Sequence, residues 1–296
     1  MKKFAIIGVG GYIAPRHLKA IKDVGGRLVA ACDEKDSVGQ LDAHSYDVEF
    51  FTDDKEFAAF LKTSGVDILI VCSPNHLHVD HAIMGLEAGT DVICEKPLAL
   101  TQSELDRLVA AEKKSGKRVG TILQLRVHPS LVAIQQDLIA LGKTDHTVKM
   151  KYITSRGPWY HRSWKGNVEK SGGLATNIGV HLFDLLVWFF GTPGKVEVTE
   201  SNPHLVSGTL EFERAKVSWL LSVDNHHLPE EHRKAGKNTY RSITVDGNEV
   251  EFSEGFNDLH TVIYRRFLQG KIFGIEDVRQ GIKIVEEIRR PSGRLP

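Results

Sequence analysis

The sequence predicts an α/β fold in two domains, and three observations lead to that prediction. The first 120 or so residues alternate short β-rich runs with helical patterns, which is typical of a doubly wound parallel sheet. After about residue 125, many runs instead alternate polar and apolar residues, as half-buried antiparallel strands do. A chain of 296 residues is long enough for two ordinary cores. We therefore expect a parallel-sheet domain over residues 1–122 and an α+β domain, with a large, mostly antiparallel sheet, over residues 123–296.

In the first half, the pattern places the strands and helices in strict alternation. A capping box formed by Thr101 and Glu104 marks the start of the fourth helix. The apolar run at residues 4–8 is too short for a signal sequence and leads directly into a glycine turn, so we expect it to be the first strand. The expected strands are 4–8, 28–33, 67–72, 91–95 and 119–124, and the expected helices are 14–23, 54–63, 76–88 and 101–115.

The second half combines strands with one strongly apolar helix. We expect that helix over residues 173–190, another helix after His128-Pro129, and two more before the end of the chain. Asp246-Gly247 is a hairpin-turn signal between the last two strands. Residues 290–296 should break the final helix. The expected strands are 147–154, 194–200, 205–213, 217–223, 242–245 and 249–252.

Composition narrows the classes of partner. Lysine plus arginine equals aspartate plus glutamate, 38 each, so we expect neither nucleic acid nor a membrane surface as a partner. No apolar stretch is long enough to cross a bilayer. The three cysteines, Cys32, Cys72 and Cys94, end apolar runs, which indicates buried reduced thiols and the cytoplasm.

Residues 8–14 form a glycine turn between a strand and a helix, where a dinucleotide pyrophosphate binds in Rossmann domains. Ile13 stands where a third small residue is usual. Asp33, at the end of the second strand, should accept from ribose hydroxyls and repel a 2′-phosphate, which favours NAD, although Lys35 leaves a minor route to NADP. The cofactor-binding residues that we expect are Gly8, Gly10, Gly11, Tyr12, Ile13, Asp33, Ser73, Pro74, Asn75, His78, Glu95, Lys96 and Gln124.

The segment Ser73–His78 follows a strand and should border the cofactor, because ligands lie beyond the carboxyl ends of parallel strands. His76, His78 and His81 superficially resemble metal ligands. No cysteine or carboxylate completes a convincing set, so we expect no metal. For His78 and His81, a structural role on the following helix is the simpler interpretation.

Lys96 and His181 are the candidate acid/base residues. Lys96 follows the expected strand 91–95, where an ammonium group can hold a hydroxyl and stabilise oxyanion charge, although alone it would be taken for a surface lysine. His181 can accept a proton from an alcohol, and a core histidine is the competing interpretation. Asn177 lies four residues earlier, on the same face of the expected helix, where its amide could position the hydroxyl. Asp184 would either orient the His181 ring or cap a polar patch.

The glycine turn, Glu95-Lys96-Pro97 and the glycine-rich segment that ends at His181 together resemble the family of glucose-fructose oxidoreductase, inositol dehydrogenase and MocA-like proteins. This resemblance covers nearly the whole chain and implies that Lys96 and His181 are catalytic. Many members carry aspartate four residues before the histidine, whereas this chain has Asn177.

Residues 11–17, 122–126, 152–160, 163–166 and 176–181 look like one branch of the family, bacterial dehydrogenases of UDP-N-acetylglucosaminuronic acid. Ile13 is shared with that branch. The resemblance implies oxidation at C3, a following pyridoxal-phosphate aminotransferase, a route to surface polysaccharide such as lipopolysaccharide O-antigen, and a homodimer or homotetramer. Basic and aromatic side chains could bind the diphosphate, the carboxylate and the rings. The expected substrate-binding residues are Arg126, Arg156, Trp159, Tyr160, Trp164, Lys165, Asn177, His181, Tyr240 and Arg241, with Arg162 as a further base.

Two other functions stay open. The same fold and cofactor would suit a dehydrogenase of a free polyol or simple sugar, but a small polyol has little need for the bases and aromatic residues at 155–165. A non-catalytic NAD(H) sensor would not need both Lys96 and His181.

Overall fold

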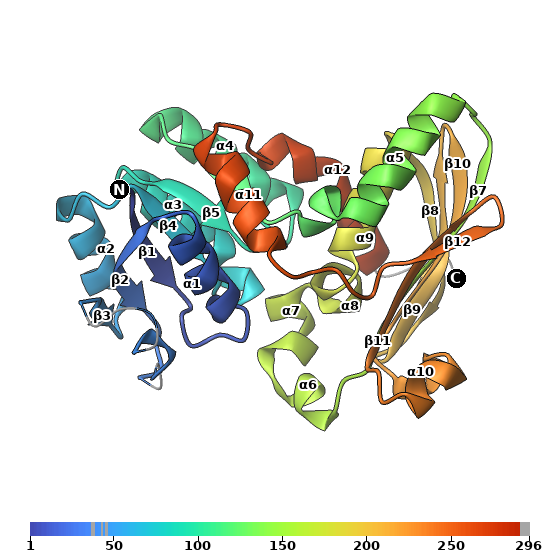
Figure 1. Ribbon diagram of the computed structural model, residues 1–296, viewed down its shortest axis with the longest axis horizontal. Helices are drawn as coiled ribbons and strands as arrows, with labels where there is room; N and C mark the ends of the chain where they lie inside the picture. Colours follow the sequence, from blue (N-terminus) through green and yellow to red (C-terminus); the bar gives the residue numbers. More distant parts are fainter. Residues whose placement is uncertain (37–38, 43, 45–46, 291–296) are drawn as a thin grey trace. The chain divides into compact units, whose positions relative to one another are not determined.

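The structure, a computed structural model, describes residues 1–36, 39–42, 44 and 47–290. Its contacts divide the chain into two compact units (Figure 1). The first unit contains Met1–Gln124 and Phe256–Val278, and the second contains Leu125–Gly255 and the residues from Arg279 onward. The expected division into 1–122 and 123–296 differs from this arrangement, because residues 256–278 belong to the first unit. The break expected within residues 290–296 falls almost wholly outside the described residues.

The first unit is built on a six-stranded parallel sheet in the order β3-β2-β1-β4-β5-β6. The chain order reverses between β1 and β4, and in such sheets the ligand lies beyond the carboxyl ends of the strands at this point. The short strand β3 was not anticipated. The strands are β1 (Lys3–Ile7), β2 (Arg27–Cys32), β3 (Glu49–Phe51), β4 (Ile68–Val71), β5 (Asp91–Cys94) and β6 (Val119–Thr121).

Helices pack in two groups around this sheet. Helix α1 (Ala14–Asp23) packs beside α11 (Leu259–Leu268), and α3 (His78–Glu87) packs beside both α2 (Asp54–Thr63) and α4 (Gln102–Ser115) (Figure 1). Right-handed crossovers on either side of the switch point put α1 and α3 on opposite faces of the sheet. The expected capping box is present, with Thr101 accepting from the backbone of Glu104.

The second unit contains a six-stranded sheet in the order β12-β11-β7-β10-β9-β8, in which β7 and β10 are parallel and the other pairs antiparallel. Asp246 and Gly247 have φ angles of +50° and +90°, so the predicted hairpin turn is confirmed. The elements are α5 (Pro129–Leu141), β7 (His146–Thr154), α6 (Pro158–Arg162), α7 (Val168–Ser171), α8 (Gly173–Asn177), α9 (Val180–Phe190), β8 (Pro193–Ser201), β9 (Leu205–Phe212), β10 (Ala215–Ser222), α10 (Glu230–Lys234), β11 (Thr239–Val245), β12 (Asn248–Glu251) and α12 (Ile275–Arg289), which begins in the first unit.

The single helix expected over residues 173–190 is wrong. The chain forms α8 and α9 with a break at Ile178 and Gly179. Gly179 lies against the Leu221 side chain, and a Cβ atom there would also come within 2.5 Å of the carbonyl oxygen of Ala175, so this position has room only for glycine. Asn177 and His181 therefore belong to two helices, and the argument that they share one helix face does not hold.

No single helix in the described part of the chain is long and apolar enough to cross a membrane. Val168–Asn177 and Val180–Phe190 reach that length and composition only as a pair bent by 46°. Most residues of α9 are buried, as in the core helix of a globular unit.

The three cysteines are buried and unbridged, as the sequence indicated. Burial raises the pKa of Cys32 to about 12 and raises the pKa of Cys72 and of Cys94 well above the ordinary value. These thiols are therefore poor nucleophiles in the folded protein.

Candidate functional site

The glycine turn after β1 is shaped for close approach of a ligand to the backbone. Gly8 has a φ angle of +89°, and a Cβ atom there would lie 2.5 Å from the backbone nitrogen of Ser73. At Gly10, a Cβ atom would lie 3.1 Å from Oδ2 of Asp33. A side chain at Gly8 would collide with the backbone of Ser73, and one at Gly10 would crowd Asp33, so glycine allows the tight turn that fits the pyrophosphate of a dinucleotide in Rossmann domains.

Asp33 is held at the end of β2 by two backbone groups. Its Oδ2 accepts from the N–H of Gly10 at 2.8 Å, and its Oδ1 accepts from the N–H of Lys35 at 3.0 Å. The carboxylate is thus fixed beside the glycine turn, where a ribose acid is expected. Tyr12, another expected cofactor contact, is 85% exposed and could fold over a ligand in this turn.

The loop after β4 is oriented by a chain of side chains that the sequence did not suggest. Asp54 accepts from Nε2–H of His81 at 3.2 Å, and Nδ1 of His81 accepts from the Ser73 hydroxyl at 2.8 Å. Because a carboxylate only accepts, it fixes the histidine tautomer and therefore the direction of the Ser73 hydroxyl. Ser73 keeps its place among the candidate cofactor contacts.

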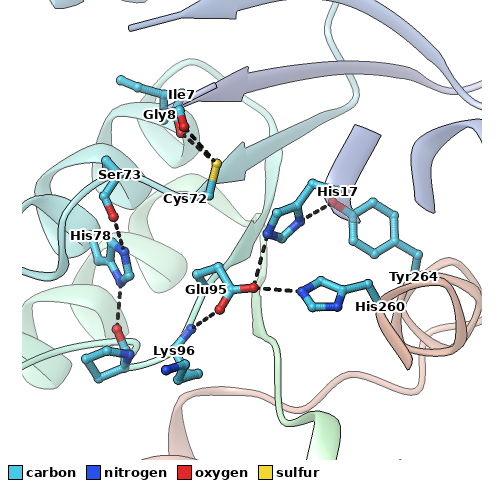
Figure 2. A network of polar contacts seen from close by, with 11 residues as sticks. Ile7, Gly8, His17, Cys72, Ser73, His78, Glu95, Lys96, His260 and Tyr264 are labelled. Atoms are coloured by element: carbon cyan, nitrogen blue, oxygen red, sulfur yellow. Dashed lines mark hydrogen bonds and ion pairs between the residues drawn. The ribbon is translucent and has the colours of Figure 1, made fainter. Parts of the chain in front are cut away.

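His78 differs from its expected role as a direct cofactor contact. Its ring is buried, with Nδ1 2.7 Å from the Pro97 carbonyl oxygen and Nε2 2.8 Å from that of Ser73 (Figure 2). Burial lowers the pKa of His78, against the effect of the two carbonyl contacts. The ring thus joins the loop after β4 to the loop after β5, which is a structural role.

Glu95 and Lys96 follow β5, and their side chains lie in different surroundings. The Glu95 carboxylate is buried among His17, His260 and the backbone of Lys96 (Figure 2). The side chain of Glu95 is thus committed to the interior, and only its backbone could reach a cofactor. Lys96 is half-buried at the carboxyl end of the sheet, and the Lys96–Pro97 peptide bond is cis.

Two further features of the first unit stand apart from the cofactor turn. A cavity of about 290 Å³ between α1 and α11 contains none of the expected cofactor-binding residues. Among the described residues, the histidines and carboxylate that could jointly hold a metal ion are His17, Glu95 and His260, not the His76–His81 stretch that the sequence drew attention to.

In the second unit, Asn177 is tied to the aromatic segment that precedes it. Its Nδ2 donates to the Tyr160 hydroxyl oxygen at 2.9 Å. Tyr160 is 3% exposed, and burial raises the pKa of its hydroxyl, although the Asn177 contact opposes this. His181 is the second residue of α9 and is 6% exposed. Lys96 belongs to the first unit and His181 to the second.

Arg126 and Asp184 form a buried ion pair. Nε and Nη2 of Arg126 donate to Oδ2 and Oδ1 of Asp184 at 3.0 and 2.7 Å, and the side chains are 9% and 3% exposed. The sequence suggested that Asp184 either orients His181 or caps a polar patch. In the structure, Asp184 binds Arg126. This pairing compensates the charge of Arg126, which weakens the case for Arg126 as an anion-binding residue.

The segment at residues 156–165, which contains the short helix α6, presents bases and aromatic rings. Nζ of Lys165 lies 5.3 Å from the ring centroid of Trp159 and 5.7 Å from that of Trp164, within the range of cation–π attraction. Trp159 is 51% exposed, and Arg156 and Arg162 are also exposed. These side chains are thus available to a ligand.

Tyr240 and Arg241 lie on β11 rather than in this segment. The Tyr240 hydroxyl donates to Glu249 at 2.7 Å, and Arg241 stacks on the Tyr152 ring at 4.6 Å and donates to its hydroxyl oxygen at 3.0 Å. Both side chains have partners within the sheet, so a role in diphosphate binding would require these contacts to change.

The family comparisons agree with this geometry. The chain matches the oxidoreductase family described as NAD-binding Rossmann fold over residues 2–122, and the C-terminal alpha/beta domain of that oxidoreductase family over residues 144–233. The chain therefore belongs to the family of glucose-fructose oxidoreductase, inositol dehydrogenase and MocA, and its first unit contains an NAD-binding Rossmann domain.

One solved structure is similar to this chain over nearly its whole length. The WlbA (WbpB) dehydrogenase from Thermus thermophilus, in complex with NAD and UDP-GlcNAcA, is 49% identical with a TM-score of 0.95, over 98% of this chain and 95% of that chain. The WlbA dehydrogenase from Bordetella pertussis is 22% identical with a TM-score of 0.80, over 97% and 94%, which shows the fold alone.

Curated relatives match less of the chain. D-glucoside 3-dehydrogenase of Escherichia coli (strain K12) is 27% identical over 65% of this chain and 61% of that enzyme. Inositol 2-dehydrogenase of Salmonella typhimurium is 33% identical over 40% and 35%. This chain thus spans less than two thirds of the length of either relative.

Proposed function

We propose that this protein oxidises the C3 hydroxyl of UDP-N-acetyl-D-glucosaminuronic acid to the 3-keto sugar with NAD as the oxidant. The observation that supports this most strongly is the 49% identity to the Thermus dehydrogenase, which binds NAD and UDP-GlcNAcA. The glycine turn and Asp33 fit that cofactor. The exposed side chains of Arg156, Trp159 and Arg162 suit a substrate with a diphosphate, a carboxylate and rings.

In the proposed reaction the alcohol loses a hydride from C3 and a proton from its hydroxyl group, and different groups accept them. Bound NAD supplies the acceptor for the hydride from C3. His181 takes the hydroxyl proton, because its unperturbed pKa lies near neutrality. Lys96 holds the same oxygen and stabilises the charge that develops there. Asn177, kept in place by Tyr160, is a candidate to position the substrate through its amide.

The first experiment mixes the protein with NAD and UDP-N-acetylglucosaminuronic acid and follows NADH absorbance. We expect Lys96→Met and His181→Ala each to lower kcat by about 10²–10⁴-fold, the range for losing a positioned acid/base group, with little change in NAD affinity. Near-native kcat in a folded variant would remove that residue from the mechanism.

A second candidate function is oxidation of a free polyol or simple sugar, favoured by the similarity to D-glucoside 3-dehydrogenase and inositol 2-dehydrogenase. Replacing the nucleotide sugar acid by glucosides or inositols in the same assay separates the two. Alanine at Arg156 or Lys165 should raise KM for the UDP-sugar acid only. Binding of NAD(H) without turnover of any substrate would favour a sensor instead.

We further propose the wider setting that the branch implies. A pyridoxal-phosphate aminotransferase would convert the ketone to an amine on the route to surface polysaccharide such as O-antigen, and the enzyme would be a homodimer or homotetramer. The three buried thiols suit a reducing compartment, so the cytoplasm is the proposed location. NADH would be reoxidised in place by 2-oxoglutarate or released. The Thermus enzyme has also been solved with NAD and alpha-ketoglutarate, so faster turnover on adding this oxoacid would favour the first route.

A further inference from the structure

A buried carboxylate lies directly beside Lys96 in the first unit. Oε1 of Glu95 accepts from Nε2–H of His17 at 3.1 Å and from Nε2–H of His260 at 2.8 Å (Figure 2). Its Oε2 accepts from the backbone N–H of Lys96 at 3.1 Å. The side chains of His17, Glu95 and His260 are 0%, 8% and 4% exposed. Three N–H donors thus replace the water that a carboxylate of this kind would otherwise bind.

The direction of each hydrogen bond follows from the carboxylate. Because Glu95 only accepts, His17 presents Nε2–H to it and keeps a lone pair on Nδ1. That lone pair lies 2.8 Å from the Tyr264 hydroxyl, which therefore donates to it. Tyr264 is fully buried, and the rings of His17 and His260 meet edge to face at 5.0 Å. The Tyr264 hydroxyl donates to His17, and His17, His260 and the Lys96 backbone donate to Glu95, so the network has one defined arrangement.

The protonation states agree with this arrangement. Burial alone would raise the pKa of Glu95, but the N–H groups of His17 and His260 outweigh it and hold the pKa well below its usual range. Burial lowers the pKa of His17 despite its bond to Glu95, and burial raises the pKa of Tyr264 well above its usual range. At neutral pH, Glu95 is therefore ionised, His17 is neutral and Tyr264 is a donor.

The network joins three elements that are distant in sequence. His17 lies on α1, the helix that follows the glycine turn. Glu95 and Lys96 follow β5. His260 and Tyr264 lie on α11. We propose that Glu95, held by His17 and His260, is a positioning residue that fixes the backbone of Lys96 and so aims its ammonium group at the substrate oxygen. This inference rests on the catalytic role proposed for Lys96. A displacement of about 1 Å in such a group can cost about 10²-fold in rate.

Two imidazoles and a carboxylate are also ligands that Zn²⁺ accepts, and their ligand atoms lie within 4.8 Å of one another. The distances favour hydrogen bonds, because both Nε2 atoms lie 2.8–3.1 Å from one and the same oxygen. Metal analysis of the purified protein decides between the two: bound zinc at one ion per chain, lost in Glu95→Gln, would overturn the positioning role.

The decisive variant is Glu95→Gln, which keeps the side-chain volume but replaces one accepting oxygen by an N–H donor. The remaining oxygen can face either the two histidines or the N–H of Lys96, but it cannot accept from all three. We expect kcat to fall by about 10²-fold while the dissociation constant for NAD, measured by titration, stays within about threefold. Tyr264→Phe removes only the outermost donor and should lower kcat by about 2–10-fold, the range for one hydrogen bond. The matched control is His146→Gln, which breaks the bond between a buried histidine and the part-exposed Asp246 in the second unit and should leave kcat unchanged.

A readout independent of the substrate is hydrogen exchange at the Lys96 amide. The Glu95 amide is bonded to the Val71 carbonyl and not to the Glu95 side chain, so this amide serves as an internal reference. Pro97, on the other side of Lys96, has no N–H and gives no exchange signal. We expect Glu95→Gln to speed exchange at Lys96 by at least about tenfold and to leave Glu95 unchanged. Unchanged exchange at Lys96 in Glu95→Gln would overturn the inference. A Glu95→Gln variant with native kcat and only a lower melting temperature would overturn it as well. If Glu95→Gln does not fold, unchanged kcat and unchanged Lys96 exchange in Tyr264→Phe would overturn it. Inactivity of the unaltered protein toward the UDP-sugar acid would instead refute the proposed function, and Lys96 exchange would still decide the positioning role.

Discussion

Asp184→Asn tests how much the second unit depends on its buried ion pair. The substitution keeps the shape of the side chain but leaves the Arg126 guanidinium, 9% exposed, without the carboxylate that accepts two of its N–H groups. Removing one partner of a buried pair costs about 3–5 kcal/mol, because an uncompensated charge stays in a poorly solvated position. With a urea dependence of about 2 kcal/mol per M, the unfolding midpoint should fall by about 1.5–2.5 M.

Tryptophan fluorescence is suited to this measurement, because all four tryptophans, Trp159, Trp164, Trp188 and Trp219, lie in the second unit. The control is Glu230→Gln, the same change of carboxylate to amide in the exposed pair Lys234–Glu230, whose side chains are 75% and 69% exposed. Such an i, i+4 pair contributes about 0.3–0.5 kcal/mol. Equal midpoints for the two variants would refute the argument that burial, and not the presence of an ion pair, sets the cost.

Three further predictions concern the first unit. Asp33→Ala should narrow an NAD preference over NADP that we expect to be at least about tenfold in kcat/KM, and an unaltered ratio would remove Asp33 from cofactor choice. Gly8→Ala should abolish NAD binding or folding, because its φ is +89° and the new Cβ would lie 2.5 Å from the Ser73 nitrogen; native binding in calorimetry would contradict this. Acid should destabilise the unit. Burial lowers the pKa of His17 from its ordinary value of 6.5, so the stability that neutral His17 contributes above pH 6.5 is lost as the pH falls toward its folded-state pKa. The pKa of Glu95 lies well below its ordinary value of 4.5, so the stability that ionised Glu95 contributes is lost as the pH falls below 4.5. Thermal melting followed by circular dichroism at pH 7 and pH 5 should show a smaller difference for His17→Gln, and an equal difference would show that His17 is not the titrating group.

Local patterns in the sequence were enough to predict most of the helices and strands and the position of Asp33 beside the glycine turn. The helices expected at 14–23 and 54–63 have those bounds in the structure, and the Asp246-Gly247 turn adopts the positive φ angles that its residues favour. Such features depend on neighbours in the chain, so periodicity and turn chemistry reveal them. Asp33 could be placed beside the glycine turn for the same reason, since both follow adjacent strands of a parallel sheet.

Features that depend on distant residues could not be predicted in this way. At the break, Gly179 lies against Leu221, which comes from β10, and an apolar run gives no sign of that contact. The bonds of Glu95 join residues 78 and 165 positions apart, so neither histidine stands out locally. The only available signal for His17 was its place in the branch-like segment 11–17, which carries no role by itself. Asp54 and His81 are likewise joined across 27 positions, and the return of residues 256–278 to the first unit is a contact of the same long-range kind.

The pairing of charges within the second unit separates the bases that were first grouped together as anion contacts. Arg126 is compensated by Asp184, and Arg241 stacks on Tyr152, so either would have to give up a contact before it could bind a diphosphate. Arg156 is exposed to solvent, and Lys165 is half-buried with its ammonium group over the rings of Trp159 and Trp164. Desolvating a cation that is already paired gains little, whereas an anion adds a strong, charge-assisted partner to an exposed one. Recognition of a nucleotide sugar acid should therefore depend on the segment 156–165 more than on the sheet, and this segment is where a nucleotide-sugar enzyme and a polyol dehydrogenase of the same fold would differ.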